Sequence, residues 1–334
     1  MTEKILSLFR HHGGRVNTAR AVFPSAPLPW IDLSTGISPY SWSGPCTEDL
    51  TALPDPDEIA DLEKAAATYF GCAEHLIAAL PGADMGLRLL PRLIKAQSVA
   101  VVSPTYQGHV EAWRDAGAEV QLMPRDSIAT CEAHVVVLVN PNNPDGKTTE
   151  ASEVLKILQR QQSRDGWLIV DESFVDVAPE MSVAAHAQRG LVVLRSFGKF
   201  FGLPGARLGF VVGDDAILKA IRTVTGAWPV NVQALQLGTQ AYGDFAWHQQ
   251  TRARLMADTE RLDRLFSDNG IGVYGGTSLF RLVSCANGEK AFLDLAARGV
   301  LVRSFDYAPH WLRFGIPRAD QWTRVADALA ECRQ

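Results

Sequence analysis

Short apolar runs alternate with amphipathic segments between residues 76 and 213 of the chain. In the segment EASEVLKILQRQQSR (150–164), for example, apolar residues recur at helical spacing. The runs that we expect to form strands are residues 76–80, 98–103, 134–140, 167–173, 191–196 and 207–213. This alternation is typical of a mostly parallel sheet covered by helices on both faces, and such sheets bind ligands at the carboxyl ends of their strands. We therefore predict an α/β fold with its chemistry at these strand ends.

The length of 334 residues suits two domains. We expect residues 1–34 to form an N-terminal arm, residues 35–215 a large domain, and residues 216–334 a small C-terminal domain. The stretch DDAILKAIRTVTGAWPVN predicts a helix that Pro229 stops, and a helical pattern then continues to about residue 267. Short strands expected in the small domain are residues 278–284, 300–305 and 311–316. They predict an α+β arrangement.

Composition excludes several classes of partner. The formal net charge is −5, which argues against a nucleic-acid partner. Five cysteines lie far apart with no C-x-x-C pair, so we expect reduced thiols and neither a disulfide framework nor a metal site. No apolar stretch is long enough for a membrane span or a signal-peptide core, so we expect no membrane association and a cytoplasmic protein.

Polar or glycine-rich motifs follow the first three expected strands of the large domain. In LPGADMG, the backbone N–H groups of Gly82, Ala83 and Asp84 would open a helix and suit a phosphate group. Any strand-to-helix turn looks similar, so this motif alone is weak. In SPTYQG, the Tyr106 side chain either packs over the hydrophobic core or stacks against a planar ring. In NPNNPDG, two Asn-Pro pairs predict an extended turn that presents the Asn143 amide.

The next two strands end in a carboxylate and in a cationic turn. Asp171 in VDES is either a turn aspartate or a buried acid that needs a partner. The turn SFGKFFGLPGARLG contains Ser196, Lys199 and Arg207. On its own it could be an ordinary surface turn that connects two core strands. Together the five motifs offer a reactive amine, phosphate ligands, a stacking aromatic, an amide and a carboxylate. These are the needs of pyridoxal 5'-phosphate, in which a Schiff-base lysine holds the cofactor.

The order and spacing of PGAD, PTY, NPNNP, VDES and the lysine turn resemble fold-type-I pyridoxal-phosphate enzymes of the class I/II aminotransferase superfamily. The resemblance covers nearly the entire chain. It implies that Lys199 is the Schiff-base lysine, that Ser196 and Arg207 hold the cofactor phosphate, and that the protein is a homodimer. Two positions depart from the family pattern, because Phe174 and Leu53 stand where many members have tyrosines.

Within the superfamily, the chain resembles the branch that acts on phosphorylated amino acids, which contains histidinol-phosphate aminotransferases and the threonine-phosphate decarboxylases of cobalamin biosynthesis. The resemblance implies that Arg313 in WLRFGI binds the substrate α-carboxylate and that Arg303 in VLVRSF binds its phosphate. Without that context, either arginine could be an ordinary edge-strand charge.

Two N-terminal segments, HHGGR and DLSTGISPY, are similar to the decarboxylase group, as are NPNNPDG and Phe174. His12 and Gly13 in the first segment and Gly36 in the second would then contact the substrate. Glycine lets backbone N–H groups approach a phosphate closely, although a terminal segment can also have no role.

We therefore expect decarboxylation of L-threonine O-3-phosphate to (R)-1-amino-2-propanol O-2-phosphate, with Lys199 and Asp171 as the catalytic residues. Histidinol-phosphate aminotransferase, or a related class I/II aminotransferase, is the nearest alternative. The segment PNNPDGKT nearly matches a phosphate-binding P-loop, but Pro141 replaces its first glycine and removes an N–H donor. A catalytically silent interaction protein is the third alternative, and Lys199 argues against it.

Overall fold

The computed structural model describes residues 2–10, 12–47 and 49–332. The chain forms two compact units. Unit 1 comprises Met1–Tyr40, Pro144–Gly146 and Gln249–Gln334, and unit 2 comprises Ser41–Asn143 and Lys147–His248. This division places residues 216–248 in unit 2, whereas the sequence pattern assigned them to the C-terminal domain. The physical reason is that the helices of this segment pack on the secondary structure of unit 2.

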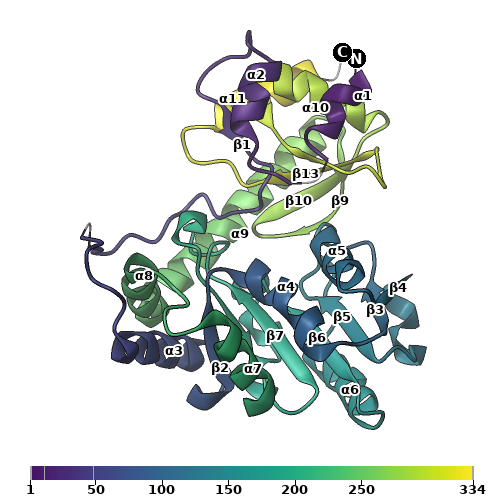
Figure 1. The fold of residues 1–334 in the computed structure, drawn as a ribbon. Coiled ribbons are helices and arrows are strands. Elements are labelled where there is room, and N and C mark those ends of the chain that lie inside the picture. The colour runs from purple at the N-terminus through teal and green to yellow at the C-terminus, as the bar shows by residue number, and fades with distance from the viewer. Residues whose placement is uncertain (1, 11, 48, 333–334) are drawn as a thin grey trace. The chain divides into compact units, whose positions relative to one another are not determined.

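A seven-stranded sheet forms the centre of unit 2, in the order β2-β8-β7-β6-β5-β3-β4 (Figure 1). The strands are β2 (Ile77–Leu80), β3 (Ser98–Val102), β4 (Glu119–Met123), β5 (Val135–Val139), β6 (Trp167–Asp171), β7 (Leu191–Ser196) and β8 (Gly209–Val212). Within this sheet, the described strand β8 runs antiparallel to both of its neighbours, β2 and β7, and the other neighbouring pairs are parallel. The predicted mostly parallel sheet is confirmed.

Helices cover both faces of this sheet. They are α3 (Pro56–Phe70), α4 (Ala83–Ile94), α5 (Gln107–Asp115), α6 (Ala151–Gln162), α7 (Asp215–Thr225) and α8 (Val232–Gly243). Apolar residues of α4, α5 and α7 pack into one core with alternate residues of the strands, among them Val211. Phe210 points to the other face because side chains alternate along a strand, and there it packs against Phe70 of α3. Short 3₁₀ turns are η1 (Glu74–Leu76), η2 (Arg125–Thr130), η3 (Val175–Val177), η4 (Pro179–Met181), η5 (Ala184–His186) and η6 (Pro204–Ala206).

Unit 1 contains a four-stranded antiparallel sheet, in the order β12-β13-β10-β9, and a parallel pair formed by β1 and β11. Its strands are β1 (Ile31–Asp32), β9 (Gly272–Thr277), β10 (Phe280–Ser284), β11 (Val300–Leu301), β12 (Arg303–Ser304) and β13 (Trp311–Gly315). Its helices are α1 (Thr2–Ser7), α2 (Val16–Val22), α10 (Gly288–Ala297) and α11 (Trp322–Glu331), with most of α9 (Phe245–Asp268).

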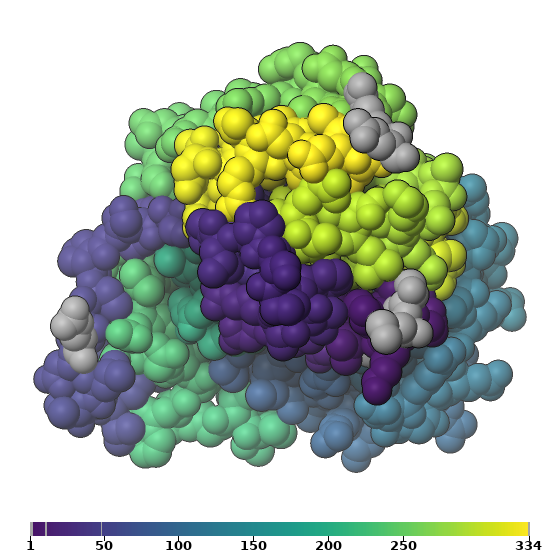
Figure 2. Space-filling view, turned by 90° about the horizontal axis from the view of Figure 1, so that it is seen from above, coloured from purple at the N-terminus to yellow at the C-terminus, as the bar shows by residue number. Residues whose placement is uncertain are grey.

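The N-terminal residues belong to this unit. Figure 2 shows them in purple beside the yellow-green and yellow C-terminal segments. The Phe9 ring lies 5.4 Å from the Phe292 ring of α10, and Arg10 Nη2 donates to Glu289 Oε1 at 2.8 Å. Leu6 and Phe9 are almost fully buried. These contacts fix the beginning of the chain to the surface of unit 1.

Several local expectations were wrong. Strands β4 and β9 were not predicted, because β4 is largely exposed and β9 contains three glycines, so neither shows a continuous apolar run. Helix α7 ends before Gly226, whose φ of +72° stops it ahead of Pro229. The expected strand at residues 300–305 is divided between β11 and β12, which belong to different sheets. No helix in the described part of the chain is long and apolar enough to cross a membrane.

Candidate active site

The predicted cofactor residues of unit 2 gather at one edge of its sheet. Strands β3, β5, β6 and β7 are mutually parallel, and β2 shares their direction because β8 runs antiparallel to both β2 and β7. Their carboxyl ends therefore meet at the same edge. Asp171 is the last residue of β6 and Ser196 the last of β7, while Tyr106 and Asn143 lie in the turns after β3 and β5. The strand order therefore brings these four residues to one edge of the sheet, although they lie far apart in the sequence.

The beginning of α4 forms a cradle for an anion. Gly82 precedes this helix with a φ of +96°, and a Cβ atom placed on it would lie 2.7 Å from Nη2 of Arg207. A Cβ on Gly209 would lie 2.3 Å from the Ala83 nitrogen. The two glycines thus let a guanidinium and a strand approach the first turn of a helix, where backbone N–H groups point outward. The Asp84 side chain turns to Arg88 at 3.0 Å, so Asp84 can contribute only its backbone N–H to this cradle.

Asp171 is a buried carboxylate with partners on both oxygens. Its Oδ1 accepts hydrogen bonds from Ser173 N at 2.9 Å and Ser173 Oγ at 2.5 Å, and its Oδ2 lies 2.8 Å from His109 Nε2. Burial by itself would raise the pKa of Asp171, but the contacts with His109 and Ser173 outweigh it and hold the pKa below its ordinary value. Asp171 is therefore ionised at neutral pH.

His109 was missed by the sequence analysis. It lies in α5 and only 1% of its surface is exposed. The available signal was its position three residues after Tyr106 at the start of a helix, a spacing that puts two side chains on one face. The Tyr106 and His109 rings meet edge to face at 6.3 Å, and burial raises the pKa of Tyr106 to about 12. The Tyr106 phenol is thus neutral.

Lys199 and Asn143 are both half-buried. The Lys199 ammonium lies 5.4 Å from the centre of the Phe174 ring, a cation–π contact at the position where many family members have tyrosine. Asn142 fixes the turn beside Asn143, since its Oδ1 accepts from Thr105 Oγ1 at 2.8 Å and its Nδ2 donates to the Pro104 carbonyl at 2.9 Å.

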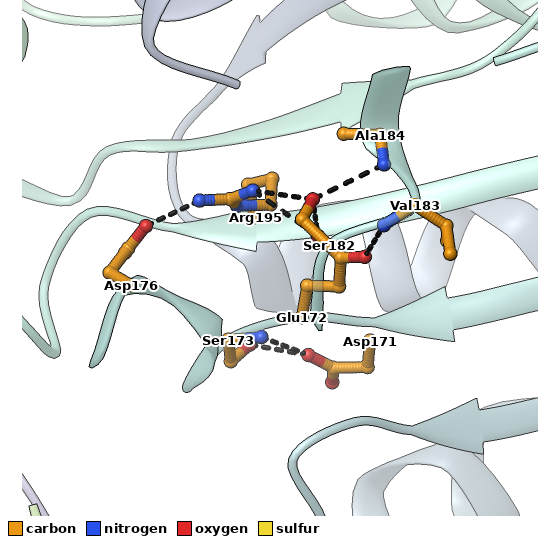
Figure 3. A network of polar contacts seen from close by, with 8 residues as sticks. All are labelled: Asp171, Glu172, Ser173, Asp176, Ser182, Val183, Ala184 and Arg195. Atoms are coloured by element: carbon orange, nitrogen blue, oxygen red, sulfur yellow. Dashed lines mark hydrogen bonds and ion pairs between the residues drawn. The ribbon is translucent and has the colours of Figure 1, made fainter. Parts of the chain in front are cut away.

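A buried polar cluster joins the ends of β6 and β7 and was also missed (Figure 3). Arg195 Nη1 donates to Glu172 Oε2 and to Ser182 Oγ, both at 3.2 Å, and Arg195 Nη2 donates to Asp176. Glu172 Oε1 accepts from the Val183 backbone N–H at 2.7 Å. Arg195 and Glu172 are the immediate sequence neighbours of Ser196 and Asp171. The cluster therefore fixes the spacing of two predicted cofactor residues.

In unit 1, the two predicted substrate arginines face each other across a strand pair. Arg303 of β12 is directly opposite Arg313 of β13 in the antiparallel register. Like charges in this relation repel, and Arg313 is only 5% exposed. Burial, together with the charge of Arg303, lowers the pKa of Arg313 to about 9. An anionic ligand beside the two arginines would stabilise the charged form of Arg313.

The N-terminal arm lies beside this arginine pair. Arg303 donates to the carbonyl oxygens of Phe9 at 2.5 Å and Arg10 at 2.6 Å. Arg313 Nη2 donates to the Ser34 carbonyl at 2.8 Å. A Cβ on Gly13 would lie 2.5 Å from that same carbonyl oxygen, so glycine is required for this approach. The structure thus brings Gly13, Arg303 and Arg313 into one assembly.

His12 and Gly36 flank this assembly. His12 is exposed and directly precedes Gly13. Gly36 is buried two residues after Ser34, with a φ of +62° that favours glycine. Within the described ranges, no group of three or more acidic, histidine or cysteine side chains is arranged to hold a metal ion.

Comparison with known proteins gives a consistent result. The model of the family described as aminotransferase class I and II matches residues 47–329. A threonine-phosphate decarboxylase from Pseudomonas aeruginosa is 42% identical, over 95% of this chain and 96% of that protein. A second threonine-phosphate decarboxylase, from Sinorhizobium sp, is 39% identical over 96% and 97% of the two chains. The crystal structure of histidinol-phosphate aminotransferase from Sinorhizobium meliloti in complex with pyridoxal-5'-phosphate superposes with a TM-score of 0.81 at 18% identity, over 95% and 94% of the two chains.

Proposed function

Because the chain belongs to the aminotransferase class I and II family, we propose that it is a pyridoxal-phosphate-dependent decarboxylase of L-threonine O-3-phosphate. The products would be carbon dioxide and (R)-1-amino-2-propanol O-2-phosphate, a building block for cobalamin biosynthesis. The identities of 42% and 39% to two threonine-phosphate decarboxylases support this reaction. The histidinol-phosphate aminotransferase shares 18% identity and supports the fold alone.

The observation that carries the substrate class is the opposed pair Arg303 and Arg313. Two guanidinium groups side by side suit a substrate with two anionic groups, and threonine phosphate has a phosphate monoester and a carboxylate. Arginine binds both groups through its planar fork of N–H donors. We assign the phosphate to Arg303 with His12, Gly13 and Gly36, and the carboxylate to Arg313. Binding either anion would raise the pKa of Arg313 back towards its ordinary value.

The donor set of unit 2 fits pyridoxal phosphate. The glycine-lined cradle at the start of α4, with Ser196 and Arg207, would hold the phosphate group. Tyr106 would stack on the ring, Asn143 would donate to the phenolic oxygen, and the ionised Asp171 would pair with the ring nitrogen. Lys199 would bind the cofactor covalently through its amine. When bound, the cofactor supplies an electron sink for the electron pair that remains at Cα after carbon dioxide leaves.

The residues of this chain have separate tasks in such a reaction. Asp171 would place a negative charge at the ring nitrogen, and His109 and Ser173 favour the ionised form of that carboxylate. The Lys199 amine would be a base and acid of suitable chemistry to return a proton to Cα. Arg313 orients the carboxylate, and it accelerates the loss of carbon dioxide only if it binds the reacting pose more tightly than the resting one.

We also propose a homodimer in the cytoplasm. Leu50 and Leu53 are 63% and 67% exposed on one segment of unit 2, and apolar side chains that lie close together on a surface can mark an interaction site. Many family members have a tyrosine at the position of Leu53 that reaches the neighbouring subunit. All five cysteines are free, as expected for a reducing compartment.

The decisive experiment supplies the cofactor-loaded protein with phosphothreonine and follows carbon dioxide and keto-acid formation together. We expect carbon dioxide without keto acid. Keto-acid formation with 2-oxoglutarate, or turnover of histidinol phosphate, would replace the proposal by an aminotransferase.

A variant of the arginine pair tests the substrate class. Arg303→Ala should lower kcat/KM for phosphothreonine by a free energy of about 2–5 kcal/mol, because a dianion loses its bidentate partner. The same variant should affect unphosphorylated threonine much less. Arg298→Ala is the matched control, since Arg298 also lies in unit 1 but binds Glu331 at the surface. Equal losses for both substrates would show that Arg303 does not read the phosphate.

A further inference from the structure

Ser34 makes a hydrogen bond with each of its polar groups, although only 1% of its surface is exposed. Its backbone N–H and its hydroxyl both donate to Asp32 Oδ1, at 2.9 Å and 2.6 Å. Its hydroxyl oxygen accepts from the Gly14 backbone N–H at 2.8 Å. Its carbonyl oxygen accepts from Arg313 Nη2 at 2.8 Å. One serine therefore connects the N-terminal arm to a substrate arginine.

The direction of these bonds matters. Because the hydroxyl hydrogen is committed to Asp32, the lone pairs of Ser34 Oγ are fixed in orientation, and one of them meets the Gly14 N–H. Asp32 thus sets the rotamer of Ser34, and Ser34 sets the position of the turn at Gly13 and Gly14. The positive φ of Gly14, +78°, gives this turn a conformation that other residues rarely adopt.

Packing holds the turn against Ser34 as closely as the hydrogen bond does. A Cβ on Gly13 would lie 2.7 Å from Ser34 Oγ, so the arm backbone rests directly on this side chain. Four residues earlier in the arm, Arg303 holds the carbonyl of Phe9, and it also holds that of Arg10. Arg303 and Ser34 therefore hold the arm before and after His12, in addition to the contacts of Phe9 and Arg10 with α10.

We propose that Ser34 is a positioning residue that sets selectivity for phosphorylated substrates, an inference that rests on the proposed function. Ser34 does this by holding the glycine turn of the N-terminal arm at a fixed place relative to Arg303 and Arg313. The arm presents its backbone N–H groups and His12 to the phosphate only while this turn is held. Loss of the Ser34 hydroxyl releases the turn and leaves the carboxylate arginine in place.

Ser34→Ala separates these two effects within one residue. The substitution removes the hydroxyl that holds Gly14, but it keeps the backbone carbonyl that accepts from Arg313. Ser38→Ala is the matched control, because Ser38 is also buried at 4% exposure and its hydroxyl bonds to the nearby Tyr40 backbone, donating to the carbonyl at 3.0 Å and accepting from the N–H at 3.1 Å. Ser34→Cys places a larger thiol, which is a weak acceptor, at the same position and replaces the alanine variant if that variant does not fold.

The experiment measures three quantities on the cofactor-loaded protein and its variants. The first is kcat/KM for phosphothreonine and for unphosphorylated threonine. The second is protection against thermal unfolding by inorganic phosphate. The third is amide hydrogen exchange in the peptide that contains Gly13 and Gly14. Loading the cofactor fills the phosphate cradle of unit 2, so added phosphate reports on unit 1.

For Ser34→Ala we expect about a tenfold loss of kcat/KM for phosphothreonine, as one hydrogen bond predicts, and at most about a twofold loss for threonine. Exchange at the glycine turn should accelerate, and protection by inorganic phosphate should weaken. Ser38→Ala should match the wild type in all three. Equal losses for both substrates, or unchanged exchange at the turn, would overturn the positioning role.

The outcome also distinguishes the two proposals. If wild-type protein does not turn over phosphothreonine but loses phosphate protection on Ser34→Ala, the proposed reaction fails and the positioning role of Ser34 stands. If phosphothreonine is decarboxylated and Ser34→Ala binds phosphate as the wild type does, the positioning role fails alone. If the wild type neither binds phosphate nor uses phosphothreonine, both fail.

Discussion

Each unit contains a deeply buried arginine, and the two differ in how their surroundings treat the charge. Arg195 in unit 2 is 2% exposed and Arg313 in unit 1 is 5% exposed. Burial acts to lower the pKa of Arg195, but Asp176 and Glu172 more than compensate and raise it above its ordinary value. Around Arg313, burial and the charge of Arg303 dominate and lower the pKa to about 9.

We infer from this difference that Arg195 is a structural cation and that Arg313 suits a bound anion. The protein itself supplies carboxylates to Arg195, so the charge is neutralised within the fold and fixes the ends of β6 and β7. The surroundings of Arg313 destabilise its charged form, and an anionic substrate group would stabilise that form. Exposure alone does not distinguish the two arginines. The sign of the pKa shift does.

The strongest test of the division between the units is Lys199→Ala, because only unit 2 is assigned covalent chemistry. The variant lacks the amine to which we assign cofactor binding, so we expect essentially complete loss of turnover and of the visible absorbance of the lysine-bound cofactor. Lys219→Ala, on the exposed face of α7, is the control and should retain both. An undiminished absorbance in Lys199→Ala would remove Lys199 from the site.

Asp171→Asn addresses the carboxylate of unit 2. The asparagine retains an oxygen for Ser173 but lacks the negative charge that would keep the ring nitrogen of the cofactor protonated. We expect turnover to fall by about two to three orders of magnitude, with cofactor binding retained through Lys199 and the phosphate cradle. Steady-state kinetics and cofactor titration measure the two effects. Near wild-type turnover would reduce Asp171 to a turn residue.

The comparison of the two arginines is tested by replacing each with methionine. Arg195→Met leaves two buried carboxylates without their cation and should lower the free energy of unfolding by about 3–5 kcal/mol. Arg313→Met should change it by less than about 1 kcal/mol, or increase it, because the folded state disfavours this charge. In the wild type, burying the charged Arg313 lowers the free energy of unfolding at pH values below about 9. This loss of stability becomes smaller as the pH rises above about 9, because Arg313 then gives up its proton in the folded state.

Urea unfolding of the unliganded variants measures both free energies. Arg313→Met should nevertheless lose phosphothreonine turnover, whereas the folded fraction of Arg195→Met should retain substrate affinity. Equal destabilisation by the two substitutions would end the distinction between a structural and a binding arginine.

The smallest expected effect belongs to His109→Asn. His109 lowers the pKa of Asp171 against the effect of burial, so its removal should raise that pKa. Asp171 would then take up a proton at a higher pH, and the acid limb of the kcat profile should move upward while kcat at higher pH changes by less than about tenfold. His75→Asn, at an exposed position of unit 2, is the control. An unmoved acid limb would show that His109 only fills space.

The α/β class and the order of the chemical motifs could be predicted from the sequence alone. Both depend on local patterns: the apolar runs that became β5, β6 and β7, and turns such as the one around Lys199. Glycines such as Gly82, which let another group approach the backbone closely, could also be predicted because they lie in recognisable local motifs. Strands without such a pattern, β4 and β9, were not.

Which side chains contact one another could be seen only in the folded chain. His109 meets Asp171 across 62 positions of sequence, and Ser34 meets Arg313 across 279. Arg195 acquires its two carboxylates, and Arg313 its opposed arginine, through strand register and through burial. A side chain's charge state depends on which groups lie within a few ångströms and on how much water is excluded, and neither quantity is written in the local sequence.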